Sequence, residues 1–131
     1  MEDLKKYTLL IVDDEEMLRE TIVFDFKRKG FNVLEAASGA QAFEIVKKNK
    51  IHLVVSDMRM PGGDGMSLLE SIRAYDPALP TVIFVTGFAD VTEDQAIAKG
   101  ARKVLSKPFD RKILMNSVLE ALGISAATQT P

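Results

Sequence analysis

The sequence predicts a three-layer α/β sandwich built on a five-stranded parallel sheet. Five short β-rich runs alternate with five segments of helical spacing, and the connections between them are short. A short connection through a helix brings the chain back to a neighbouring parallel strand. The predicted strands are Thr8–Val12, Phe31–Ala36, Ile51–Ser56, Thr81–Thr86 and Lys103–Ser106.

The composition of each run indicates its place in the sheet. The first, third and fourth runs are apolar almost throughout, which is typical of central parallel strands covered on both faces by helices. The second run contains Asn32 and Glu35, and the fifth is flanked by Arg102 and Lys103. These two runs are therefore predicted to be the edge strands.

The segments between the runs carry apolar residues at helical spacing. In the first segment Leu18, Ile22 and Phe26 recur every four residues, and Gly30 follows as a stop signal. The fourth segment has the fewest apolar residues. The predicted helices are Glu15–Lys29, Ala40–Lys48, Met66–Tyr75, Val91–Lys99 and Asp110–Leu122.

Length and composition exclude several classes of protein. The chain has 131 residues, 17 of them basic and 19 acidic, with a net charge of −2. One domain over residues 1–123 is expected, with 124–131 as a polar tail or the start of a linker.

The small net charge argues against a module whose main function is to bind nucleic acid. The absence of Cys and the single His exclude thiol chemistry and multi-histidine metal sites. No apolar run is long enough to span a membrane, and no signal peptide is recognisable, so a cytoplasmic protein is expected.

Polar side chains stand at the carboxyl ends of four predicted strands, which is the edge where open α/β sheets bind ligands. They are Asp13 and Asp14, Asp57, Thr86 and Lys107. Three converging carboxylates require either raised pKa values or a bound cation. Because the donors are all oxygens, Mg²⁺ is the predicted cation. An aspartate can be a phosphoryl acceptor, and a lysine and a threonine hydroxyl suit a phosphoryl group, so the set favours phosphoryl transfer.

Each of these residues also has a structural interpretation when taken alone. Asp13 and Asp14 could cap the following helix, Asp57 could be a turn residue, and Lys107 could be a solvated surface charge. Their joint occurrence at four strand ends favours a site. Glu15 and Glu16 are expected to favour a helix N-terminus electrostatically, and His52, inside the third run, is expected to be structural.

Four sequence blocks resemble the response-regulator receiver domains of bacterial two-component signalling over roughly residues 7 to 122. They are Ile11-Val12-Asp13-Asp14-Glu15, Asp57-Met58-Arg59-Met60-Pro61-Gly62-Gly63-Asp64-Gly65, Val85-Thr86-Gly87 and Lys107-Pro108-Phe109. The resemblance implies a flavodoxin-like fold with strand order 2-1-3-4-5. It also implies a phosphorylation switch, which catalyses only its own phosphorylation and dephosphorylation.

The resemblance assigns roles to individual residues. Asp57 would be the phosphoacceptor. Asp57 and Asp14 would bind Mg²⁺ directly, Asp13 through water, and Arg59 through its main-chain carbonyl. Lys107 and Thr86 would contact the phosphoryl group. The Lys107-Pro108 bond would be cis, and Gly62, Gly63 and Gly65 would permit the tight loop after the acceptor.

The resemblance also implies partners. A histidine kinase or histidine phosphotransfer protein would donate the phosphoryl group. A downstream protein or domain would bind the face made by the last two predicted helices and the fifth strand, whose conformation phosphorylation would shift. The domain itself would be a monomer or weak homodimer, without direct contact with nucleic acid or membrane.

One position departs from the family pattern. Family members often have Tyr or Phe three residues before the lysine, where this chain has Val104. The aromatic part of the usual switch is therefore not expected here. Arg59 and Phe88, two residues beyond the acceptor and the threonine, are hypothesised to alter water access to the phosphoryl group.

Three other functions fit these residues less well. An aspartate-nucleophile phosphatase would need an acid where Arg59 stands. A flavin-binding module would need a Ser, Thr and Gly-rich loop where this chain is acidic. A receiver-like interaction domain not regulated by phosphorylation remains the alternative, against which the complete set of Asp14, Asp57, Thr86 and Lys107 argues.

Overall fold

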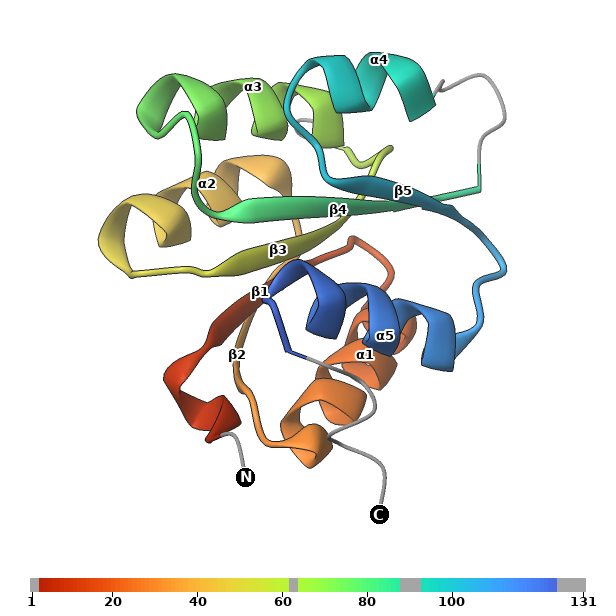
Figure 1. The fold of residues 1–131 in the computed structure, drawn as a ribbon. Helices are drawn as coiled ribbons and strands as arrows, with labels where there is room; N and C mark the ends of the chain where they lie inside the picture. The colour runs from red at the N-terminus through yellow and green to blue at the C-terminus, as the bar shows by residue number, and fades with distance from the viewer. Residues whose placement is uncertain (1–2, 62–63, 88–92, 125–131) are drawn as a thin grey trace.

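The computed structural model describes residues 3–61, 64–87 and 93–124 (Figure 1). Five strands form one sheet in the order β2-β1-β3-β4-β5, and every neighbouring pair is parallel. The predicted fold class and strand order are both confirmed, and β2 and β5 are the edge strands as expected. The strands are β1 (Thr8–Val12), β2 (Asn32–Ala36), β3 (Leu53–Asp57), β4 (Thr81–Thr86) and β5 (Lys103–Ser106).

The helices begin where polar side chains can satisfy their first N–H groups. The side chains of Ser38, Asp64 and Asp110 each accept a hydrogen bond from a main-chain N–H in the first turn of the helix that follows. The helices are α1 (Glu16–Lys29), α2 (Gly39–Lys48), α3 (Gly65–Tyr75), α4 (Glu93–Ala98) and α5 (Arg111–Ala121). A short 3-10 helix, η1 (Leu4–Lys6), was not predicted. The predicted start of the fourth helix at Val91 lies outside the described residues.

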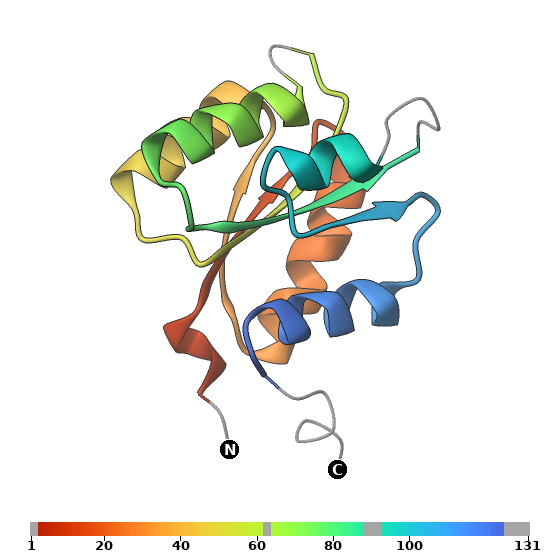
Figure 2. The same ribbon diagram turned by 45° about the horizontal axis from the view of Figure 1, so that its top comes forward.

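The helices cover both faces of the sheet. Helices α1 and α5 pack on one face, and α2, α3 and α4 pack on the other, as Figures 1 and 2 show from two directions. Alternate strand residues point to the two faces: Leu9 and Ile11 contact the α1/α5 side, whereas Leu10 and Val12 contact the α2/α3/α4 side. Burial on both faces explains why the central strands are apolar almost throughout.

His52 immediately precedes β3, whereas the sequence predicted it inside the strand. Its ring Nδ1 accepts a hydrogen bond from the Thr8 N–H at 3.0 Å, and the ring packs edge-on against Tyr7 with centroids 5.5 Å apart. This end of the sheet is opposite the carboxyl ends of the strands. His52 is therefore structural, as expected, and joins the N-terminal ends of β1 and β3.

In the described residues, no helix combines the length and the apolar character needed to cross a membrane.

Candidate functional site

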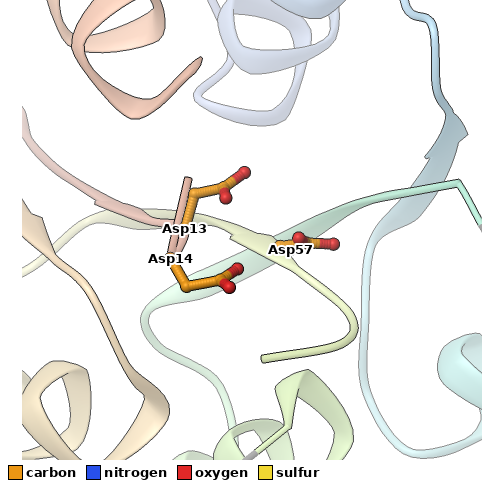
Figure 3. A group of neighbouring side chains, drawn as sticks. All are labelled: Asp13, Asp14 and Asp57. Atoms are coloured by element: carbon orange, nitrogen blue, oxygen red, sulfur yellow. The ribbon is translucent and has the colours of Figure 1, made fainter. Parts of the chain in front are cut away.

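Three carboxylates meet at the carboxyl edge of the sheet. Asp13 and Asp14 follow β1, and Asp57 is the last residue of β3. One carboxylate oxygen from each lies within 4.8 Å of the other two, and Figure 3 shows the three side chains extending to the same side. Asp13 and Asp57 are 3% and 7% exposed, whereas Asp14 is open to solvent. The convergence predicted from the strand ends is present in the fold.

The two oxygens of Asp57 have different partners. Oδ1 accepts a hydrogen bond of 2.7 Å from the main-chain N–H of Met58. Oδ2 faces Lys107, whose Nζ lies 3.2 Å away. A turn residue needs only the first of these contacts. The second brings a cation from the loop after β5 to the acceptor predicted on β3.

Asp13 is fixed by hydrogen bonds through both its main chain and its side chain. Its main-chain N–H donates to the Ala36 carbonyl at 3.2 Å, and its Oδ1 accepts from the Glu15 N–H at 2.8 Å. Its Oδ2 lies 3.5 Å from the Nζ of Lys107. The N-cap of α1 is Glu15, whose side chain makes no capping hydrogen bond. The alternative in which Asp13 or Asp14 caps this helix is therefore wrong.

The electrostatics of the site favour a cation. Burial raises the pKa of Asp13, although the Glu15 N–H and Lys107 oppose this effect. Burial lowers the pKa of Lys107, but the Asp13 and Asp57 carboxylates outweigh it, so the net effect is a raised pKa and a charged lysine. The Lys107 ammonium thus contacts two members of a cluster of three carboxylates. An all-oxygen donor set with excess negative charge fits a hard divalent cation such as Mg²⁺.

Thr86 ends β4, which pairs with β3, and is 5% exposed. Its carbonyl accepts a hydrogen bond of 2.7 Å from the main-chain N–H of Lys107. The Lys107-Pro108 peptide bond is cis, as the resemblance implied. The end of β4 and the segment carrying the lysine are therefore joined directly beside the carboxylates.

The start of α3 lies directly against the residues at the end of β3. The Gly65 N–H donates to the Met58 carbonyl at 2.7 Å. A Cβ at Gly65 would lie 2.6 Å from the Asp57 carbonyl oxygen and 2.7 Å from Cε1 of Phe84. A side chain cannot fit there without displacing the end of β3, so Gly65 permits the close return of the chain, as was predicted for it. Gly62 and Gly63 lie outside the described residues.

Arg59, Phe88 and Val104 were expected to affect how the site works, and the structure describes Arg59 and Val104. Arg59 is exposed two residues beyond Asp57, and Phe88 lies outside the described residues. Val104 is partly buried and packs against the core beneath α2, α3 and α4, opposite Phe84 in the strand pairing.

Sequence reasoning missed Arg19 of α1. Its Nη1 donates to the main-chain carbonyl of Asp13 at 2.7 Å, and its Nε lies 2.8 Å from Oε1 of Glu35. The available signals were weak: an arginine one helical turn after the acidic residues, and an acid on the predicted neighbouring strand. Only the β1–β2 register, which pairs Ile11 with Glu35, brings them together.

Comparison with known proteins agrees with this geometry. A family model described as the response regulator receiver domain matches residues 9–119. The chain is 32% identical over 118 residues to the transcriptional regulatory protein GlrR of Escherichia coli (strain K12), covering 90% of this chain and 27% of that protein. It is 32% identical over 119 residues to sporulation initiation phosphotransferase F of Bacillus subtilis (strain 168), covering 90% of this chain and 95% of that protein.

A solved structure shows the same likeness in three dimensions. The response regulator receiver domain protein from Clostridium thermocellum superposes with a TM-score of 0.83 at 31% identity, covering 89% of this chain and 94% of that one. Fold and site together define a flavodoxin-like receiver of two-component signalling. The chain belongs to the response regulator receiver domain family. It spans about a quarter of the length of the GlrR regulator that it matches.

Proposed function

We propose that this receiver is a phosphorylation switch in which Asp57 accepts a phosphoryl group from a phosphohistidine of a partner kinase or phosphotransfer protein. The observation that carries the proposal is the position of the Asp57 carboxylate, which lies 3.2 Å from the Lys107 ammonium and has an oxygen within 4.8 Å of oxygens of Asp13 and Asp14. A relative that spans nearly the same length is named a phosphotransferase, which supports the same chemistry.

The transfer step is a simple exchange of bonds. A lone pair on a carboxylate oxygen of Asp57 forms a bond to phosphorus as the phosphorus–nitrogen bond of the phosphohistidine breaks. The imidazole leaves with the bonding electrons and takes up a proton. The product is an acyl phosphate, which is lost when water attacks phosphorus and the Asp57 carboxylate leaves.

The residues around Asp57 position the group and neutralise its charge. Lys107 offsets negative charge on the transferring oxygens, and its own raised pKa keeps it cationic. Asp14 and Asp57 would hold Mg²⁺ directly, Asp13 through water and Arg59 through its main-chain carbonyl. When bound, the ion supplies electrostatic stabilisation of the phosphoryl oxygens.

Thr86 would carry the signal outward. Its hydroxyl would donate to a phosphoryl oxygen, and because its carbonyl is bonded to the Lys107 N–H, a shift at Thr86 is passed to the β5–α5 connection. The α4-β5-α5 face would then bind an output protein or domain differently in the two states. With Val104 in place of an aromatic residue, this shift would proceed without a large side-chain rotation. The proposed location is the cytoplasm, where such kinases deliver their phosphoryl groups.

Incubation with acetyl phosphate and Mg²⁺, followed by intact mass measurement, tests the proposal. One phosphoryl adduct is expected on the wild-type protein and none on Asp57→Asn. The matched control is Asp64→Asn, because Asp64 is an exposed aspartate on the adjacent loop whose capping bond to Ser67 an asparagine can also make. No adduct on folded wild-type protein with any donor or divalent ion would favour the unphosphorylated interaction domain.

A further inference from the structure

Arg19 connects the metal-site loop to the edge strand of the sheet. Its side chain is only 14% exposed although it begins on the first turns of α1. The planar guanidinium donates from Nη1 to the Asp13 carbonyl at 2.7 Å and from Nε to Glu35 at 2.8 Å. A rigid fork of this kind fixes both partners at once, which a lysine cannot do.

The carbonyl that Arg19 holds belongs to the peptide group between Asp13 and Asp14. Because a peptide group is planar, fixing its oxygen also fixes the direction in which the chain enters Asp14. Asp13 has further anchors through its own N–H and its Oδ1. Within the described residues, no hydrogen bond or ion pair reaches the Asp14 carboxylate, which is exposed. The placement of Asp14 therefore depends on its backbone.

Glu35 makes this arrangement compatible with cation binding. A guanidinium behind an acidic site would repel a divalent cation if its charge were uncompensated. The Glu35 carboxylate lies against it on the side facing β2, so the pair adds little net charge near the three aspartates. Arg19 can thus hold the loop without cancelling the negative charge of the site.

We infer that Arg19 is a positioning residue that presets Asp14 for a divalent cation, with Glu35 compensating its charge. The inference rests on the proposed Mg²⁺ site and deepens it, because it names a residue outside the ligand set that determines affinity. Groups that orient metal ligands typically contribute 10- to 100-fold in metal affinity. The exposed position of Asp14 places the expected effect at the lower end of that range.

The test is Mg²⁺ binding to the unphosphorylated protein by calorimetry. Arg19→Gln is expected to raise the Mg²⁺ dissociation constant about 10-fold. Arg19→Lys is expected to lie between Arg19→Gln and the wild type, because an ammonium can bond the Asp13 carbonyl but not Glu35 in the same fork. Glu35→Gln keeps the bond to Asp13 and is expected to weaken binding by less than Arg19→Gln.

Arg73→Gln is the matched control. Arg73 is also a partly buried arginine, and it donates to the Pro80 carbonyl at 2.7 Å before the start of β4, at the opposite edge of the sheet. Its loss should lower stability while leaving Mg²⁺ affinity at the wild-type value. If Arg19→Gln binds Mg²⁺ as tightly as the wild type, the inference about Arg19 is overturned and the proposed metal site is not. The same holds if Arg73→Gln loses as much Mg²⁺ affinity as Arg19→Gln. No Mg²⁺ binding by wild type overturns the metal site together with the inference.

Discussion

Lys107 and Asp57 face each other across the carboxyl edge of the sheet, with Nζ 3.2 Å from Oδ2, although fifty positions of sequence separate them. The same ammonium lies 3.5 Å from Asp13. This one cation balances only part of the charge of three carboxylates. Its removal should therefore affect metal binding and phosphorylation in opposite directions.

Lys107→Gln is expected to tighten Mg²⁺ binding several-fold, because a positive charge beside the metal site is lost. It is expected to slow adduct formation with acetyl phosphate by about 10-fold or more, because the transferring oxygens lose their cationic partner. Calorimetry and the time course of intact mass measure the two effects. Lys112→Gln, on the exposed surface of α5, should change neither. Weaker Mg²⁺ binding in Lys107→Gln would show that the lysine organises the carboxylates more than it opposes the ion.

Gly65→Ala is expected to lower the free energy of unfolding by about 1–3 kcal/mol, because its Cβ would overlap the Asp57 carbonyl and the Phe84 ring. The same displacement should slow phosphorylation. Urea unfolding measures the first effect and intact mass the second. Gly87→Ala is the control for stability, because its Cβ would meet Lys107 Cβ at an ordinary 3.8 Å. Equal stability of the two variants would contradict the close packing of the loop.

Thr86→Ala is expected to form the adduct but to lose the response to it. Asp57, Lys107 and the acidic residues remain in place, whereas the hydroxyl that would follow the phosphoryl group is gone. Amide chemical shifts of β5 and α5, recorded before and after phosphorylation, measure the response. Thr86→Ser retains the hydroxyl and should keep the shift changes. A full response in Thr86→Ala would assign the switch to another residue.

The environment of His52 predicts that the free energy of unfolding depends on pH. Burial lowers the pKa of His52 below its ordinary value of 6.5, and its Nδ1 accepts the Thr8 N–H only when unprotonated. The unfolded chain therefore binds the proton more readily than the folded one, so stability is complete above the ordinary pKa and falls as the pH drops through it. Urea unfolding from about pH 7.5 to about pH 5.5 should show this decline. Because the chain has one histidine, His52→Gln should flatten the decline, and an unchanged slope would place its cause elsewhere.

The sequence predicted the start of every strand to within two residues. Three strands, β1, β4 and β5, begin and end at the predicted residues. The other two start later than predicted, because Phe31 and Ile51 are buried in the core but stand before the first paired residues of β2 and β3. Apolar character reports burial, and burial extends beyond the hydrogen-bonded strand.

The candidate site was predictable to the extent that it depends on strand ends. Asp13, Asp14 and Asp57 converge because parallel strands end at one edge, which the alternation of strands and helices already indicates. The bond from Arg19 to Asp13 and its pairing with Glu35 depend on strand register and on a side-chain conformation, neither of which has a periodic signal in the sequence. Residues that support a site from a neighbouring element are therefore the part that only the three-dimensional structure reveals.

The central claim is that Asp57 carries the phosphoryl group as an acyl phosphate. Borohydride reduces an acyl phosphate to an alcohol, which converts a phosphorylated aspartate to homoserine. After treatment with acetyl phosphate and Mg²⁺ and then borohydride, peptide mass mapping is predicted to find homoserine at position 57 and unmodified aspartate at positions 13, 14 and 64. Homoserine at another aspartate, or a phosphoryl group that survives reduction on a serine, threonine or histidine, would contradict the assignment.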